Sequence, residues 1–127
     1  MKEYSTPIDV VIAWVDGSDP ELSKKRMNYL DSNEKDLIPG ANPTRFHSLN
    51  EISYCVLSIL KFAPFVRKIF IVTDKQNPNI DNVVKQYFPE RVSDIQIVDH
   101  SEIFQGYEDY LPTFNSICIS NMLWRIK

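Results

Sequence analysis

The stretch from Ile8 to Pro20 constrains the fold of this chain more than any other. Residues 8–15 form a nearly unbroken apolar run, IDVVIAWV, which ends abruptly in the polar sequence DGSDP. A short apolar run bounded by turn residues is typical of a strand buried on both faces, as in a parallel sheet. The polar residues then lie at the carboxyl end of the strand, where open α/β sheets bind their ligands. The stretch therefore predicts the first strand and first site loop of a nucleotide- or sugar-handling domain.

The rest of the chain alternates between extended and helical patterns. Apolar runs predict strands at residues 68–73 and 94–100, and apolar residues at helical spacing predict helices at 20–31, 49–63, 82–88 and 114–126. Strands that alternate with helices indicate a parallel sheet. The predicted fold class is α/β, a mostly parallel sheet with flanking helices. No Gly-x-Gly-x-x-Gly and no phosphate-loop lysine pattern is present, which disfavours dinucleotide oxidoreductases and phosphate-loop enzymes.

Local signals predict where the helices begin. Asp19 is a candidate N-cap carboxylate, followed directly by a proline. Ser48 and Glu51 have the spacing of a capping box, and Thr113 is expected to cap the last helix. Residues 32–47, between the first two helices, are predicted to form a loop, and a loop of this length in a compact domain is often functional.

Composition excludes some functional classes. The 127 residues carry a net charge of −3 and the sequence pI is about 5.3, so nucleic-acid binding is not expected. No apolar stretch approaches the ~20 residues of a membrane span, and residues 1–7 lack the apolar core of a signal peptide. Cys55 and Cys118 lie in apolar-periodic segments and are predicted to be reduced core residues. These features indicate a cytoplasmic location, whereas they do not indicate an oligomeric state.

All three predicted strands end in polar residues that are capable of chemistry. In a parallel sheet these ends gather along one edge, so three distant segments are expected to converge on one crevice. The residues delivered there are Asp16, Ser18 and Asp19 after the first strand, Thr73, Asp74 and Gln76 after the second, and Asp99 and His100 after the third.

Each candidate residue has a functional and a structural interpretation. Gly17 beside Asp16 lets the backbone approach a ligand closely, or it belongs to an ordinary turn. Trp14 stacks on a base or sugar, or it packs in the core. His100 is a general base or orients a phosphate, and the alternative is a structural histidine. Arg45 pairs with a phosphate or forms a surface salt bridge. No His, Cys or Asp spacing in the sequence makes a convincing metal site.

Three blocks of the sequence together resemble the Stealth family of sugar-phosphate transferases. The first is IDVVIAWVDGSDP at residues 8–20. The second block runs from Arg45-Phe46 through Glu51 and continues with residues 63–74 and Gln76. The third block consists of residues 98–100, residues 103–104 and the sequence LPTFNS at 111–116. The family includes bacterial capsular polysaccharide phosphotransferases and the animal enzyme that begins the mannose-6-phosphate tag, and the resemblance covers nearly the whole chain.

The resemblance implies transfer of a hexose-1-phosphate from a nucleotide sugar to a sugar hydroxyl of a glycan acceptor, in capsular or exopolysaccharide synthesis. It also implies a partial glycosyltransferase-A or Rossmann-like core and a divalent metal, commonly Mg²⁺. In that scheme Asp16 and Gly17 shape the donor pocket and Arg45 faces phosphate. Asn115 and Ser116 line the acceptor side.

The chain also departs from the family pattern. The family usually continues into an Asn-Asp-Asp strand, whereas this chain ends at residue 127 inside a predicted helix, so we expect residues 1–127 to be a single, incomplete domain with the metal ligands beyond it. Leu57 replaces an arginine, Lys75 a glycine, Ser120 a glutamate and Trp124 a histidine. These departures suggest a divergent subgroup or a decaying gene, and weak transfer by the isolated chain. Two alternatives stay open: a non-catalytic remnant that binds a nucleotide sugar or a partner, and a fragment of an ordinary glycosyltransferase-A enzyme.

Overall fold

The computed structural model describes residues 6–29 and 48–127. In these ranges the strands form a parallel sheet in the order β1 (Ile8–Ala13), β2 (Val66–Thr73) and β3 (Ile95–Asp99). The register places Val72 of β2 opposite both Ala13 and Val98, so the three carboxyl ends lie at the same edge. The predicted α/β class with a parallel sheet is confirmed.

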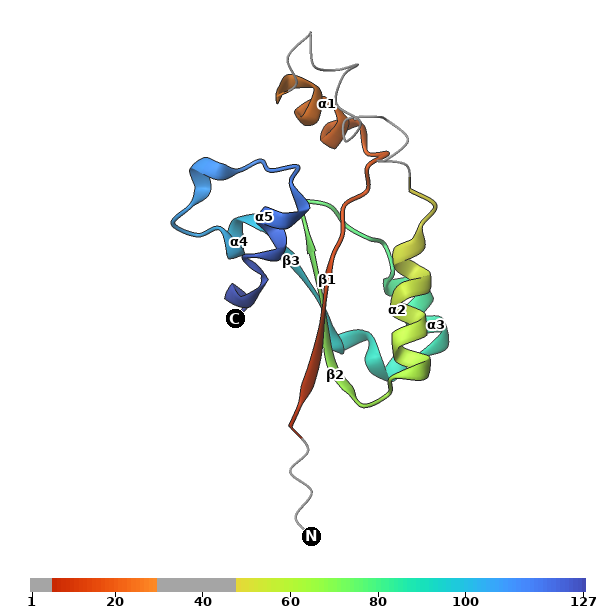
Figure 1. The fold of residues 1–127 in the computed structure, drawn as a ribbon. Helices are drawn as coiled ribbons and strands as arrows, with labels where there is room; N and C mark the ends of the chain where they lie inside the picture. The colour runs from red at the N-terminus through yellow and green to blue at the C-terminus, as the bar shows by residue number, and fades with distance from the viewer. Residues whose placement is uncertain (1–5, 30–47) are drawn as a thin grey trace.

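Helices lie on both sides of this sheet (Figure 1). One side carries α2 (Glu51–Phe62) and α3 (Asp81–Tyr87), and the other carries α4 (His100–Ile103) and α5 (Ser116–Ser120). Helix α1 (Pro20–Tyr29) lies beyond the carboxyl end of β1. Short 3₁₀ turns at Pro89–Asp94, Glu108–Tyr110 and Leu123–Arg125 complete the described elements.

Strand β2 is the centre of the hydrophobic core. Ile69 and Ile71 point to the α2/α3 side, and Phe70 and Val72 point to the α4/α5 side, since side chains alternate along a strand. All four are buried, and truncating one of these isoleucines to alanine typically costs about 2–5 kcal/mol of folding free energy. The two core clusters therefore meet at one strand, which fixes the position of the loop that follows it.

The prediction that the first strand is buried on both faces is wrong. In the described sheet β1 lies at an edge, and Ile8 and Val11 are 51% and 40% exposed. Val10 and Ile12 pack against the α2/α3 cluster, whereas Val11 on the other face is exposed. Hydrophobicity alone does not distinguish an edge strand from a central one, and the two-sided burial belongs to β2.

Two predicted helix starts are also corrected. Helix α2 begins at Glu51, and its N-cap residue is Asn50, in a left-handed conformation, rather than Ser48. The side chains of Ser48 and Glu51 still meet, at 3.4 Å, ahead of the helix. The last helix is capped by Asn115, whose side chain accepts from the Ile117 N–H, and α5 ends at Ser120 rather than running to residue 126.

The cysteines are not in the core, contrary to the prediction. Cys55 on α2 and Cys118 on α5 are both free and exposed, on opposite sides of the sheet. None of the helices in the described ranges combines the length and apolarity that a bilayer crossing requires.

Candidate functional site

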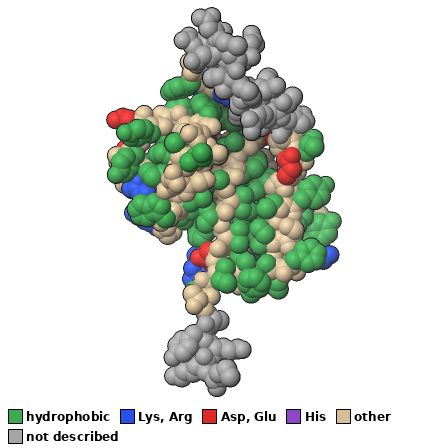
Figure 2. All heavy atoms as spheres, in the orientation of Figure 1, with side chains coloured by type: hydrophobic (Ala, Val, Ile, Leu, Met, Phe, Trp, Pro, Cys, Tyr) green, Lys and Arg blue, Asp and Glu red, His purple; other side chains and the backbone are tan. Residues whose placement is uncertain are grey.

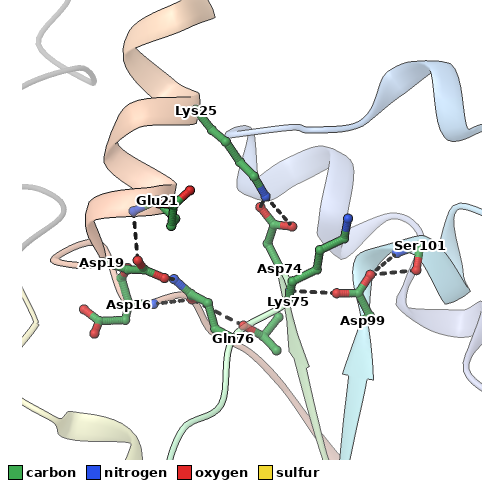
Figure 3. A network of polar contacts seen from close by, with 10 residues as sticks. Asp16, Asp19, Glu21, Lys25, Asp74, Lys75, Gln76, Asp99 and Ser101 are labelled. Atoms are coloured by element: carbon green, nitrogen blue, oxygen red, sulfur yellow. Dashed lines mark hydrogen bonds and ion pairs between the residues drawn. The ribbon is translucent and has the colours of Figure 1, made fainter.

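The loops after β1 and β2 run side by side at the carboxyl edge of the sheet. The Trp14 N–H donates to the Val72 carbonyl at 2.8 Å, which extends the β1–β2 pairing past the end of β1. Beyond this bond, Asp16 and Gln76 come together although sixty residues separate them in the sequence. The predicted convergence of the strand ends is therefore present for these two loops (Figure 3).

The side chain of Gln76 holds the backbone of Asp16 in place. Its Oε1 accepts from the Asp16 N–H at 2.7 Å, and its Nε2 donates to the Asp16 carbonyl at 3.0 Å. The same Nε2 donates to Asp19 Oδ2 at 2.9 Å, and Thr73 Oγ1 lies 3.4 Å from Oε1. One amide thus connects the end of β2 with the loop after β1 and the start of α1.

Asp19 caps the first helix, as the sequence predicts. Its Oδ1 accepts from the Glu21 N–H at 2.9 Å, while its Oδ2 accepts from Gln76. These two hydrogen bonds, Gln76 first, lower the pKa of the Asp19 carboxyl below its usual value. Asp19 is therefore an anchor of the loop.

Asp16 directs its carboxylate away from this network. In Figure 3 the backbone of Asp16 faces Gln76, and its carboxylate lies on the opposite side. The Oδ1 atom accepts from the Ser18 N–H at 2.9 Å, which makes a short turn around Gly17. The Ser18 hydroxyl in turn accepts from the Ser48 N–H at 3.2 Å, so this turn contacts the segment that leads into α2.

A polar cavity of about 290 Å³ lies beside this turn. Its size is at the lower end of small-ligand sites, which run from about 300 to 1,000 Å³. Trp14 packs against the α2/α3 core and also lines the cavity, so its packing is confirmed and its contact with a ligand stays a prediction. The cavity is lined by Trp14, Asp16, Ser18, Ser48, Asn50, Asn77, Pro78 and Asn79.

The loop after β2 contributes residues that the sequence reasoning did not name as site residues. Asn77 and Asn79 line the cavity, and the Asn77 side chain accepts from the Asn79 N–H at 2.9 Å. Asn79 and Lys75 have φ of 52° and 51°, in the left-handed region. The sequence signal for this part of the site is the polar run DKQNP at residues 74–78, directly after β2. The same run also marks the end of the strand.

The charges around the edge are mostly acidic and are partly paired. Asp74 forms an ion pair with Lys25 of α1 at 3.1 Å. None of the described residues that line the cavity is lysine or arginine. An anionic ligand would therefore need positive charge from other groups.

Asp99 ends β3 and His100 begins α4, and neither lines this cavity. Asp99 is the N-cap of α4, where it accepts from Ser101 N at 2.9 Å and Ser101 Oγ at 2.6 Å, and it also accepts from Lys75 N at 2.7 Å. Burial works against ionisation, but these hydrogen bonds prevail and lower the Asp99 pKa. His100 is only 3% exposed; burial lowers its pKa, although Asp74 and Asp99 oppose the shift.

The other candidate residues lie apart from the cavity. Thr73 is buried beneath the edge, where its hydroxyl contacts Gln76. Asn115 and Ser116 are exposed at the start of α5, and Asn115 uses its side chain as the helix cap. Arg45 lies outside the described residues.

The described residues do not fit a magnesium site by themselves. No group of three His, Cys, Asp or Glu side chains in these ranges could hold a metal ion. Asp16 is the one carboxylate among the described residues that line the cavity, and it accepts from the Ser18 N–H. Other carboxylates at this edge are engaged elsewhere: Asp19 by Gln76, Asp74 by Lys25, and Asp99 by Ser101 and Lys75 N. The magnesium requirement implied by the resemblance therefore stays a prediction.

Comparison with known proteins identifies the same two segments that build the site. Stealth protein CR1, conserved region 1, matches residues 6–34, and Stealth protein CR2, conserved region 2, matches residues 45–127. The first region contains β1 and the Asp16 turn, and the second contains β2, β3 and Gln76. Gln76, in the second region, is hydrogen-bonded to Asp16 and Asp19 in the first.

Several curated relatives match over almost the whole chain. A capsular polysaccharide phosphotransferase of Actinobacillus pleuropneumoniae is 40% identical over 122 residues, which are 95% of this chain and 31% of the relative. A capsular polysaccharide phosphotransferase of Haemophilus influenzae is 41% identical over 94% of this chain and 30% of the relative. An exopolysaccharide phosphotransferase of Streptomyces coelicolor is 36% identical over 98% of this chain and 21% of the relative. The chain spans less than a third of these relatives, and with both conserved regions present it belongs to the Stealth protein family.

Proposed function

We propose that this chain forms the donor-binding part of a sugar-phosphate transferase. The reaction is transfer of hexose-1-phosphate from a nucleotide sugar to a sugar hydroxyl of a glycan acceptor, in capsular or exopolysaccharide synthesis in the cytoplasm. The observation that carries the proposal is the cavity beside Trp14 and Asp16, held in place by Gln76, in a chain whose relatives are named polysaccharide phosphotransferases.

The cavity residues suit the neutral parts of a nucleotide sugar. Trp14 offers an aromatic surface for a base or a sugar ring, and Asn77 and Asn79 offer amides for hydroxyl groups. Glycine at position 17 lets the backbone come close to the ligand. The phosphate charge needs partners outside the described lining, so the proposal assigns it to Arg45 and to a divalent cation whose ligands lie outside these residues.

Asp16 is the proposed general base. The acceptor hydroxyl oxygen forms a bond to the phosphorus that carries the hexose, the bond from that phosphorus to the nucleoside monophosphate breaks, and the Asp16 carboxylate takes the hydroxyl proton. Asp16 lines the cavity and Gln76 fixes its backbone, which supports this role. His100, which is buried and does not line the cavity, is proposed to support the end of β3 rather than to contact the donor.

Mass analysis of the product tests the reaction class. The chain is incubated at stoichiometric concentration with UDP-N-acetylglucosamine, Mg²⁺ and a neutral oligosaccharide acceptor, and the acceptor is analysed by mass spectrometry. Sugar-phosphate transfer adds a hexosamine phosphate, whereas an ordinary glycosyltransferase adds the hexosamine alone. We expect a low yield of the phosphodiester product from this chain, and a glycoside product would contradict the proposal.

The binding-only alternative is separated by comparing binding with transfer. Ser120 and Trp124, at positions where the resemblance leads us to expect glutamate and histidine, favour this alternative. If the donor binds but stoichiometric protein gives no product, while a full-length relative makes the phosphodiester under the same conditions, the chain is a binding module. Any detectable phosphodiester product excludes that interpretation.

A further inference from the structure

A second cavity lies on the α4/α5 side of the sheet, away from the polar cavity at the strand ends. It has a volume of about 570 Å³, within the range of small-ligand sites, and it shares no lining residue with the first cavity. Figure 2 shows hydrophobic side chains gathered at the surface on this side of the molecule. Four aromatic residues line this aromatic cavity: Phe104, Tyr107, Tyr110 and Trp124.

The aromatic side chains differ in burial in a way that suits a ligand. Phe104 is 3% exposed and belongs to the core, so it forms the floor. Tyr107, Tyr110 and Trp124 are 53%, 71% and 79% exposed. Large exposed aromatic side chains gathered around one concave surface mark a binding site more often than isolated ones do.

Arg125 holds the aromatic wall in position. Its guanidinium donates to the carbonyls of Ile103 at 2.9 Å and Gln105 at 2.8 Å. Its Cζ also lies 5.3 Å from the ring centre of Tyr107 and 6.0 Å from that of Trp124. The cation thereby joins the 3₁₀ turn at Leu123–Arg125 to the loop after α4, and both aromatic rings gain a common support.

The charge pattern favours a neutral group over a phosphate here. Arg125 is the only charged residue among those lining the aromatic cavity in the described ranges, and its N–H groups already serve two carbonyls and two rings. The remaining polar groups are neutral, from Thr113, Asn121 and the tyrosine hydroxyls. The site thus combines apolar ring faces with neutral hydrogen-bonding groups.

We infer that the aromatic cavity binds a neutral sugar ring of the acceptor glycan. A pyranose presents an apolar C–H face that packs on aromatic rings and a rim of hydroxyls that bond to amides and hydroxyls. Naming the sugar as part of the acceptor rests on the proposed function, whereas binding of a neutral sugar here does not. Donor and acceptor would then use separate cavities on one chain.

The two free cysteines allow a direct test with an internal control. Cys118 lines the aromatic cavity, and Cys55 is exposed on α2, on the other side of the sheet. The chain is alkylated with iodoacetamide in the presence of maltose, cellobiose or N,N′-diacetylchitobiose, and peptide mass spectrometry gives the rate at each thiol. With a disaccharide at ten times its Kd, alkylation of Cys118 should slow about tenfold because only the unoccupied fraction reacts. The rate at Cys55 should not change.

A pair of variants separates ring stacking from general protection. In Trp124→Ala, the sugar concentration that gives half-maximal protection of Cys118 should rise about tenfold, because the variant loses one stacking surface. Phe62→Ala, which removes another exposed aromatic side chain on α2, should leave protection unchanged. Both side chains are at least three-quarters exposed, so neither variant should disturb the core.

Several outcomes would overturn the inference. One is that none of the three disaccharides protects Cys118 at millimolar concentrations. Another is that Trp124→Ala leaves the protection intact. A third is that Cys118 is protected without sugar in a way that depends on protein concentration, which would indicate a second copy of the chain. Protection of Cys118 by UDP-N-acetylglucosamine alone would also overturn it. The first three outcomes do not bear on donor binding at Trp14, so the proposed function is tested separately, whereas protection of Cys118 by the donor would also count against it.

Discussion

The side chain of Gln76 forms hydrogen bonds with both backbone groups of Asp16, accepting from its N–H at 2.7 Å and donating to its carbonyl at 3.0 Å. This pairing resembles one further rung of the β1–β2 ladder, made by a side chain where the strands have ended. The position of Gln76 depends on β2, because the buried residues of that strand leave the backbone before Gln76 little freedom to move. The backbone of Asp16, which lines the cavity, is therefore held by Gln76, which does not line it.

Removing this amide should loosen the site more than it destabilises the fold. Gln76→Ala leaves the two Asp16 groups without their partner, at about 0.5–1.5 kcal/mol per hydrogen bond, so the free energy of unfolding should fall by about 1–3 kcal/mol. Urea denaturation followed by circular dichroism gives this value. Gln86→Ala, at an exposed position in α3, is the matched control and should stay within about 0.5 kcal/mol of the unaltered chain. Equal effects of the two substitutions would contradict the role given to Gln76.

Lys75 should be less stable at its position than glycine. Its φ of 51° places an L-residue in the left-handed conformation, which costs about 1–2 kcal/mol and which glycine adopts freely. Lys75→Gly should therefore raise the melting temperature or leave it unchanged. Lys85→Gly in α3 should lower the free energy of unfolding by about 1 kcal/mol. The account of this loop fails if both glycine variants destabilise the chain to the same extent.

His100 should titrate below an ordinary histidine. Burial lowers its pKa in the folded state, so on acidification from neutral pH the unfolded chain takes up a proton first. Stability associated with His100 is therefore complete above pH ~6.5 and is lost as the pH falls from there toward the folded pKa. NMR titration of the imidazole C–H signals measures this directly, with His47→Gln used to assign the two histidines. A pKa for His100 at or above the ordinary value would contradict the burial.

Asp16→Asn should remove turnover and keep the fold. The amide retains an oxygen for the Ser18 N–H but cannot take a proton, and loss of a general base typically costs about a hundredfold or more in rate. Product formation by the Asp16→Asn variant is compared with that of the unaltered chain, and the same comparison is made in a full-length relative carrying the equivalent change. Asp81→Asn, at an exposed position at the start of α3, is the control and should retain turnover. Unchanged turnover in the Asp16 variant would remove Asp16 from the site.

The sequence was sufficient to predict the order of strands and helices and the helix cap at Asp19. It was sufficient because turn residues and apolar runs act locally, as at Asp19 and Gly17. It could not predict which strand is central, because β1 and β2 are similarly apolar, and only the neighbours of β2 bury both of its faces. Local sequence patterns therefore did not predict features that depend on which residues become neighbours in space.

The same limit explains the errors in the site and at the end of the chain. Asn115 rather than Thr113 caps α5, since either side chain can accept a backbone N–H and the path of the chain selects one. Cys118 was expected in the core because its neighbours Ile117 and Ile119 are apolar, yet only Ile119 packs inside. The aromatic cavity likewise depends on Arg125 joining two segments twenty residues apart.

The two tryptophans of this chain permit the most direct test of the central claim, that the cavity at the strand ends binds a nucleotide sugar. Trp14 lines that cavity and Trp124 lines the aromatic cavity, so their indole N–H signals in a ¹H–¹⁵N NMR spectrum report on the two places separately. On titration with UDP-N-acetylglucosamine and Mg²⁺, the account predicts a saturable shift of the Trp14 signal with the Trp124 signal unmoved. A Trp14 signal that stays in place at millimolar donor, or a shift of the Trp124 signal alone, would contradict it.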